Sequence, residues 1–359
     1  MRLAARFEIT FHQYLNERSE AVAEHALLTD WPRLIDFYRH MATTRRLDQK
    51  AVALQRTGQL GTYASCLGAE AVAVGAGTAL QTDDVHVPYY RDQAIQLLRG
   101  VTMAEILLFW GGDERGNDYQ APGARQDLPN CIPIATQLTH AAGVAAAIHY
   151  RGQHRAVLAT CGDGATSRGD FHEALNVAGV WRLPLVVLIN NNQWAISVPR
   201  SAQTASETLA QKGIGAGIEC VQVDGNDVVA VFLTAREALQ RARDGGGATL
   251  IEALSYRLGD HTTADDASRY RSREELNEAW TREPVKRLRE YLRRHGHWSA
   301  ADEQQLQEDA QRQVQAAVDS YSATPIPAAT AMFDHLYAHL PRALSAQYQQ
   351  LAARQGGKP

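Results

Sequence analysis

An aspartate between two glycines, and a pair of asparagines further along the chain, are the residues whose types and spacing best suit chemistry. Asp163 stands in Gly162-Asp163-Gly164, and Asn191-Asn192 follows at a distance that one helix can span. Carboxylate and carboxamide oxygens are ligands for a hard divalent cation. The ends of two neighbouring parallel strands could present both groups to one cation. The pair therefore indicates a site for a metal-bound diphosphate.

The segments around these residues alternate between strand and helix patterns. The predicted strands are 156–160, 185–189, 218–223 and 249–254, and the predicted helices are 171–181 and 229–243. This alternation indicates an α/β fold with an open, mostly parallel sheet flanked by helices. Ligands of such sheets bind at the carboxyl ends of the strands, where Gly162-Asp163-Gly164 begins a helix. The glycines allow a phosphate close to the backbone, and the helix start attracts its charge.

Helical patterns dominate both ends of the chain. They predict a helical N-terminal extension over 1–60, an α/β domain over 61–275, and a C-terminal helical segment over 276–359 packed on the same domain. Within the last segment, Pro284 to Arg294 is expected to be one helix, Ser299 to open a second with a capping box, and 332–340 to form a short third.

Two other interpretations of the glycine turn compete with the metal diphosphate site. Gly-Asp-Gly alone is a common turn, and an Asn pair after a strand is a common loop start. A Rossmann nucleotide site would need a third glycine, but position 167 is Ser167, and Asp163 would repel a pyrophosphate without a metal. The order of both motifs around one helix favours the metal diphosphate.

Composition limits the function classes. The 359 residues are 45% hydrophobic, and 36 Lys and Arg nearly balance 40 Asp and Glu, so no global charge favours nucleic acid or an anionic membrane. The four cysteines form no Cys-x-x-Cys pair, which argues against zinc ribbons and disulfides. No apolar run is long enough to span a membrane. A cytoplasmic protein is expected.

Three longer stretches carry a resemblance to a known family. They are Gly162 to Asp170 together with Asn191 to Ser197, Val223 to Asp227, and Tyr256 to Arg271. With them, and over most of its length, the sequence resembles the α subunit of the E1 component of thiamine diphosphate-dependent 2-oxo acid dehydrogenase complexes. The resemblance implies a thiamine diphosphate-binding fold with helical N- and C-terminal extensions, and thiamine diphosphate and Mg²⁺ as cofactors.

The resemblance also implies roles for single residues. Mg²⁺ would be bound by Asp163, Asn192 and the backbone carbonyl of Trp194, where relatives carry Tyr or Phe. The residues implied to bind the cofactor are Tyr90, Arg91, Ile134, Gly162, Asp163, Gly164, Ala165, Asn192 and His261. Among them, Tyr90 and Arg91 match the pair that grips the diphosphate, and Ile134 matches the apolar wedge beneath the bent cofactor. His261 matches the catalytic histidine on a loop.

Further positions match weaker features of the family. Thr136 and Gln137 match a structural monovalent cation site of some relatives, and the loop around His261 is expected to hold a lattice of salt bridges. The residues expected to border the substrate are Thr62, Tyr63 and Tyr89. We interpret Asp170 and Glu173 as acids that stabilise the start of a helix rather than as catalytic groups. Thr262 stands where some relatives carry a regulatory serine, which leaves phosphorylation open.

Thiamine diphosphate chemistry needs a glutamate that contacts the aminopyrimidine ring, and in this family's chemistry that glutamate comes from a second domain. The sequence shows no such domain. The resemblance implies that a separate β subunit supplies the glutamate in an α2β2 heterotetramer. The expected reaction is oxidative decarboxylation of a small 2-oxo acid and reductive acylation of the lipoyl domain of an E2 acyltransferase. The bulk of Tyr89 favours pyruvate. A branched-chain 2-oxo acid, acetoin, and an accessory cofactor-binding subunit are the alternatives.

Overall fold

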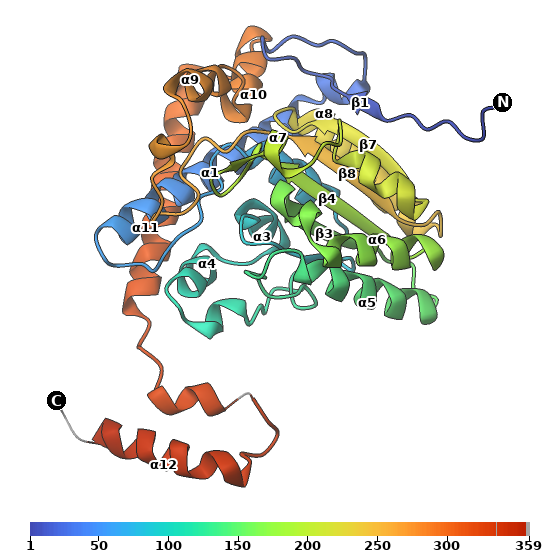
Figure 1. Cartoon of the computed structure of the whole chain (residues 1–359). Coiled ribbons are helices and arrows are strands. Elements are labelled where there is room, and N and C mark those ends of the chain that lie inside the picture. Colours follow the sequence, from blue (N-terminus) through green and yellow to red (C-terminus); the bar gives the residue numbers. More distant parts are fainter. Residues whose placement is uncertain (335, 357–359) are drawn as a thin grey trace.

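A six-stranded, wholly parallel sheet forms the centre of the computed structural model, which describes residues 1–334 and 336–356 (Figure 1). The strands in sheet order are β1 (Thr10–His12), β7 (Glu219–Asp224), β8 (Thr249–Leu254), β4 (Leu185–Asn191), β3 (Val157–Gly162) and β2 (Val85–Val87). The predicted open parallel sheet is thus confirmed, with predicted strand ends within two residues of the observed ones.

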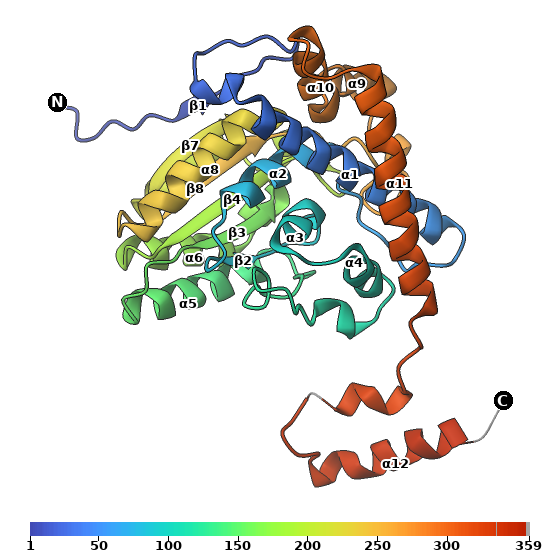
Figure 2. The same ribbon diagram turned by 180° about the vertical axis from the view of Figure 1, so that it is seen from behind.

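Helices cover both faces of this sheet (Figures 1 and 2). On one face lie α5 (Thr136–Tyr150) and α6 (Gly169–Val180), and on the other α2 (Glu70–Ala79) and α8 (Val228–Arg243). The whole of β4 is buried, with Leu188 packing toward α8 and Val187 toward α6. A strand buried on both faces needs a continuous apolar run, which explains its sequence.

Helices from the N-terminal and C-terminal parts of the chain pack together in a further layer, next to α2. It consists of α1 (Trp31–Arg56), α10 (Pro284–Arg294) and α11 (Ala300–Ala323), while α9 (Arg273–Thr281) packs against Trp194 and Tyr256. The remaining elements are α3 (Gln93–Arg99), α4 (Met103–Trp110), β5 (Trp194–Ala195), β6 (Val198–Pro199), α7 (Arg200–Gln203) and α12 (Arg342–Gly356), with 3₁₀ helices η1 (Ala26–Thr29), η2 (Glu114–Asn117), η3 (Asp163–Ser167), η4 (Ala210–Ala216), η5 (Ala267–Arg269) and η6 (Ala329–Phe333). The helix predicted over Pro284 to Arg294 and the capping box at Ser299 are confirmed.

The helices of the C-terminal segment differ from those expected. The short helix expected over 332–340 is wrong, because in the described residues the 3₁₀ helix η6 ends at Phe333 and α12 begins only at Arg342. The segment after Thr324 contacts the α/β domain at η2, where Arg115 Nη2 donates to the Pro325 carbonyl over 2.7 Å, whereas Figures 1 and 2 show α12 away from the sheet. Pro325 and Pro327 interrupt the helical chain there, since proline cannot continue an α-helix.

The N-terminal extension holds a strand that the sequence did not predict. The three residues of β1 pair with β7 at the sheet edge. The following backbone is tied down by Asp227, whose Oδ2 accepts hydrogen bonds of 2.7 Å from both Tyr14 N and Leu15 N. Among the described residues, no helix is both long enough and apolar enough to cross a bilayer.

Candidate active site

The carboxyl ends of β3 and β4 open on a cavity of about 130 Å³. Its lining comprises Tyr89, Tyr90, Arg91, Cys131, Ile134, Ala135, Gln137, Gly162, Asp163, Gly164, Ala165, Asn192, Trp194, Ala195, Ile196 and His261. Every residue expected to bind thiamine diphosphate or Mg²⁺ is in this set. Segments far apart in the sequence therefore meet at the edge of the sheet where parallel sheets bind ligands.

Asp163 carries the negative charge of the cavity. Its side chain is 1% exposed, and its only side-chain hydrogen bond in the described structure comes from Gln203, whose Nε2 donates to Oδ2 over 2.7 Å. Burial raises the pKa of this carboxyl above its ordinary value. A buried carboxylate without an ion pair is costly, and a bound cation would offset that cost.

Asn192 and Trp194 add two further oxygens to the cavity that holds Asp163. Asn192 Oδ1 accepts from Trp194 N over 3.2 Å, and the Trp194 carbonyl accepts from Arg257 Nη1 over 3.3 Å, so both oxygens already face donors. The described residues contain no group of three His, Cys, Asp or Glu side chains placed for a metal. A carboxylate, an amide oxygen and a backbone carbonyl would leave positions for phosphate oxygens and water, as Mg²⁺ prefers.

The two glycines of the turn have different roles. A Cβ on Gly164 would lie 2.7 Å from the Cβ of Ala195, so this glycine lets η3 pack against β5. A Cβ on Gly162 would meet nothing closer than Tyr89, at 4.0 Å. Gly162 therefore leaves its backbone open to a phosphate, as the sequence predicts. Gly164 is required by packing.

Arginines surround His261. Arg91 Nη2 donates to the His261 carbonyl over 2.7 Å and lies 3.1 Å from Nδ1, and Arg257 Nη1 lies 3.4 Å from the same Nδ1. Burial and these two guanidinium groups lower the pKa of His261 to about 4. The ring is then neutral at pH 7. Because arginines only donate, Nδ1 is the acceptor and the ring proton resides on Nε2.

The loop after β8 holds a lattice of hydrogen bonds rather than the expected salt bridges, since Asp266 and Arg269 form the only ion pair among its described residues. Arg257 Nη2 donates to Tyr270 Oη and to the Ile196 carbonyl, each over 2.8 Å. Tyr270 donates to Asp265, whose Oδ2 also accepts from His261 N over 2.8 Å. The pair of Asp266 and Arg269 is exposed, whereas Arg257 is buried, and the contacts of Arg257 and Asp265 with His261 hold the histidine in place.

The residues expected at the substrate lie in three different settings. Tyr89 lines the cavity, and its hydroxyl accepts from Asn190 Nδ2 over 2.8 Å. Tyr63 is fully buried and donates to Asp48 over 2.9 Å, and Thr62 is exposed. Neither Thr62 nor Tyr63 lines the cavity. The structure thus brings only Tyr89 to the candidate site.

Of the two residues matched to a monovalent cation site, only Gln137 lines the cavity. Its Nε2 donates to the Thr160 carbonyl over 2.8 Å, while its Oε1 is buried without a hydrogen-bond partner in the described structure. A buried acceptor of this kind suits a cation or water. Thr136 begins α5 beside it.

Two residues that the sequence did not predict, Gln203 and Cys131, also lie at the site. Gln203 reaches Asp163 across 40 positions, from the short helix α7. Cys131 lies in the irregular segment before Ile134 and lines the cavity. A glutamine or cysteine in a loop carries no pattern of its own, so only the three-dimensional path of the chain could place these residues.

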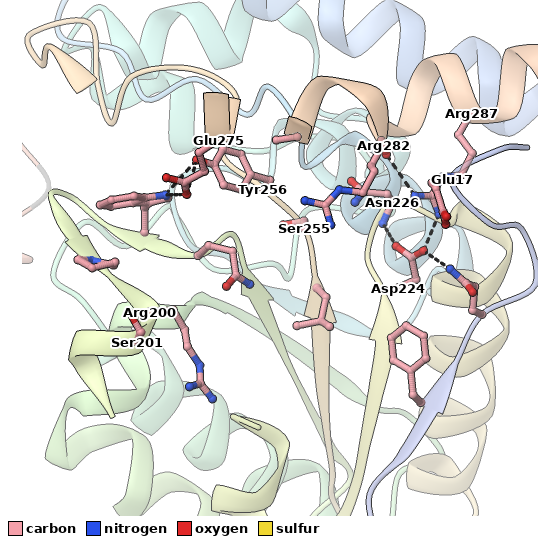
Figure 3. Close-up of a pocket in the computed structure, with 17 residues that line it drawn as sticks. Glu17, Arg200, Ser201, Asp224, Asn226, Ser255, Tyr256, Glu275, Arg282 and Arg287 are labelled. Carbon is pink, nitrogen blue, oxygen red and sulfur yellow. Dashed lines mark hydrogen bonds and ion pairs between the residues drawn. The ribbon is translucent and has the colours of Figure 1, made fainter. Parts of the chain in front are cut away.

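A larger cavity of about 600 Å³ lies beside the candidate site, at the carboxyl ends of β7 and β8 (Figure 3). Trp194 lines both cavities, and its indole Nε1 donates over 3.2 Å to Glu275 in the larger one. Charged groups there pair with each other, as Arg287 does with Asp224. None of the other predicted site residues lines it, which leaves the smaller cavity as the candidate active site.

Comparison with known proteins gives consistent results. Residues 38–330 match the model of the dehydrogenase E1 component family. The chain is 42% identical to a 3-methyl-2-oxobutanoate dehydrogenase subunit alpha of Mycobacterium tuberculosis, over 88% of this chain and 86% of that protein. It is 40% identical to a pyruvate dehydrogenase E1 component subunit alpha of Acholeplasma laidlawii (88% and 92% covered) and 39% identical to that of Bacillus subtilis (94% and 91% covered).

Proposed function

We propose a function that proceeds from one premise: this chain belongs to the dehydrogenase E1 component family. It is the α subunit of a 2-oxo acid dehydrogenase E1 that acts on pyruvate and transfers the acetyl group to the lipoyl domain of an E2 acyltransferase. One observation carries the proposal. Residues of five separate segments, selected from sequence for cofactor and metal binding, line one cavity around the buried Asp163.

In this proposal the cavity holds thiamine diphosphate with Mg²⁺. When bound, thiamine diphosphate supplies the carbon nucleophile and the electron sink for decarboxylation. Asp163, Asn192 and the Trp194 carbonyl would hold the cation. Arg91 is 3% exposed and would bind phosphate oxygens as a forked donor. Ile134 is 44% exposed, an uncommon state for an isoleucine, and would support the cofactor rings.

In this proposal the neutral ring of His261 acts as a hydrogen-bond donor and does not transfer a proton at neutral pH. Its Nδ1 is occupied by Arg91 and Arg257, which leaves Nε2–H as the free group of the ring. A neutral imidazole can hydrogen-bond a substrate carboxylate or carbonyl oxygen without adding a charge. We therefore assign His261 the role of orienting the 2-oxo acid and the incoming lipoyl group.

A β subunit completes the site in an α2β2 heterotetramer. Two features of this chain support a second chain. The candidate cavity of about 130 Å³ is smaller than pockets that enclose cofactors, so other walls are required. The segment after Thr324 also exposes large apolar side chains, with Ile326 94% and Met332 61% exposed. Exposed apolar groups of this size in one segment indicate contact with a partner.

Pyruvate is the proposed substrate because Tyr89 fills space in the cavity wall and is anchored by Asn190. The Mycobacterium relative favours a second candidate, 2-oxoisovalerate, since its name is that of a branched-chain enzyme. Small apolar groups differ by only about 1–3 kcal/mol in such pockets. The two substrates therefore have to be separated by measurement.

The test is to produce this chain together with a β subunit from the same genome and to follow ferricyanide reduction with pyruvate, 2-oxoisovalerate and acetoin. The proposal expects activity that requires thiamine diphosphate and Mg²⁺, with the highest kcat/KM on pyruvate. A higher kcat/KM on 2-oxoisovalerate would move the assignment to the branched-chain reaction. Absence of thiamine diphosphate-dependent turnover on all three would refute the function.

A further inference from the structure

Gln203 is the only described side chain that hydrogen-bonds the Asp163 carboxylate. Its Nε2 donates to Asp163 Oδ2 over 2.7 Å and also to the Val198 carbonyl over 3.3 Å. The second contact holds the amide in place, because Val198 belongs to β6 immediately before α7. The Oε1 atom of Gln203 is buried and has no hydrogen-bond partner among the described residues.

This contact divides the two oxygens of Asp163 between two tasks. Oδ2 is bound by the amide, whereas Oδ1 has no side-chain partner in the described structure. A cation that bound both oxygens would compete with the amide for Oδ2, so this contact favours binding through Oδ1 alone. Mg²⁺ needs near-ideal octahedral geometry at about 2.0–2.1 Å, while Ca²⁺ accepts both oxygens of one carboxylate at about 2.3–2.6 Å. One-oxygen binding therefore favours the smaller ion.

An amide suits this task better than a charged group would. A lysine or arginine at position 203 would neutralise Asp163 and compete with the cation, and a glutamate would repel it. Gln203 donates one hydrogen bond without adding charge, and its free Oε1 is an acceptor that a cation-bound water could satisfy. Mg²⁺ usually keeps several waters, so a buried acceptor beside the site is compatible with that ion.

We propose that Gln203 is a positioning residue that holds Asp163 in one-oxygen coordination and thereby sets the preference of the site for Mg²⁺ over Ca²⁺. The inference rests on the proposed function, because it requires the cofactor to bind through a divalent cation. In this proposal the short helix α7 has the role of positioning Asp163, the proposed metal ligand at the start of η3.

The test uses the complete chain assembled with its β subunit and two matched variants. Gln203→Met keeps the length of the side chain and removes the donor. Gln211→Met makes the same change in the same connection between β6 and β7, where Gln211 Oε1 accepts from Thr208 N over 3.0 Å. Thiamine diphosphate binding is measured calorimetrically in titrations with Mg²⁺, Mn²⁺ and Ca²⁺, and turnover is measured at increasing Mg²⁺.

For Gln203→Met we expect about tenfold weaker Mg²⁺-dependent cofactor binding, the scale of one hydrogen bond to a charged group. Ca²⁺-dependent binding should change by less than about twofold, so the ratio of Mg²⁺ to Ca²⁺ affinity falls by about fivefold or more. The half-saturating Mg²⁺ concentration should rise while kcat at saturation stays within about twofold. Gln211→Met should match the wild type in all of these.

Equal loss with all cations, or a Mg²⁺ to Ca²⁺ ratio equal to that of Gln211→Met, would overturn the role of Gln203 and leave the proposed function intact. Wild-type protein that binds no thiamine diphosphate with any cation would overturn the proposed function, and the role of Gln203 with it. The two failures are thus distinguished by the wild-type titration alone.

Discussion

Arg91 and His261 are joined twice across 170 positions of sequence. Arg91 Nη2 donates to the His261 carbonyl over 2.7 Å and lies 3.1 Å from Nδ1, and Nη1 donates to the Ser65 carbonyl. Of the five N–H donors of an arginine, these contacts occupy three. The guanidinium that we propose to bind the diphosphate therefore also fixes the loop that carries His261, the proposed catalytic residue.

The first prediction concerns the charge of His261. Because burial, Arg91 and Arg257 lower the pKa of its ring to about 4, the imidazole should remain neutral from pH 8 down to about pH 5. Diethyl pyrocarbonate reacts with neutral imidazole, so its rate at His261, followed by mass spectrometry, should be constant over this range. Free N-acetylhistidine in the same tube should lose reactivity below its ordinary pKa of about 6.5. Parallel loss at His261 would contradict a neutral ring.

The second prediction concerns the double use of Arg91. In Arg91→Lys the charge remains but the fork is lost, and a lysine cannot serve Ser65, His261 and an anion together. Thiamine diphosphate should bind about 10- to 100-fold more weakly, since more than one charge-assisted hydrogen bond is lost. The loop around His261 should also be cleaved faster by trypsin at Arg269. Arg125→Lys, at an exposed position, is the control. Weaker binding with unchanged cleavage would show that the loop does not depend on Arg91.

The third prediction separates stability from binding at Asp163. Burial raises its pKa, so the folded state favours the protonated carboxyl, and the contribution of this group to stability is lost as pH rises through the folded pKa. In Asp163→Asn the side chain is uncharged at every pH, so this loss of stability at neutral pH does not occur. At pH 7 the cofactor-free variant should have an equal or higher Tm, although Mg²⁺-dependent cofactor binding falls by more than about 100-fold, beyond the loss caused by outer-shell partners.

Calorimetric melting of the cofactor-free protein and titration with thiamine diphosphate and Mg²⁺ check both halves of this prediction. A fall in Tm of several degrees at pH 7 would show that the charged carboxylate is stabilised by the fold itself. Retained affinity would remove Asp163 from the ligand set.

The sheet and the centre of the site could be predicted because their signals are local. The apolar runs of β3 and β4 are buried on both faces, and Asp163 and Asn192 follow those strands directly. A helix between two parallel strands returns the chain to the same edge, so spacing alone placed the two residues together. Arg91, Ile134 and His261 have no such local signal, and the family resemblance was needed to select them.

The remaining features depend on contacts that a sequence does not display. The strand β1 has three residues, too few for a period, and it exists because β7 offers an unpaired edge. Gln203 meets Asp163 through the path of a loop. Tyr63 was expected at the substrate, but the buried Asp48 accepts its hydroxyl and directs the side chain into the core. In each case the position of the residue depends on a partner distant in the sequence.

The fourth prediction concerns Asp227, which ends the second stretch of family resemblance. Its Oδ2 accepts from Tyr14 N and Leu15 N, and its Oδ1 accepts from Val229 N over 3.0 Å at the start of α8. One fully buried carboxylate thus caps a helix and holds the N-terminal segment on the sheet edge. Asp227 therefore has a structural role, and it does not line the candidate cavity.

Asp227→Ala should lower the free energy of unfolding by about 2–4 kcal/mol, because a helix cap is lost and buried amides lose their acceptor. Hydrogen exchange should rise most at residues 10–15, while thiamine diphosphate affinity of the folded protein stays unchanged. Asp244→Ala, at the exposed other end of α8, is the matched control and should change stability by less than about 0.5 kcal/mol. Reduced cofactor affinity in folded Asp227→Ala protein would show that the N-terminal segment contributes to the site as well as to the sheet.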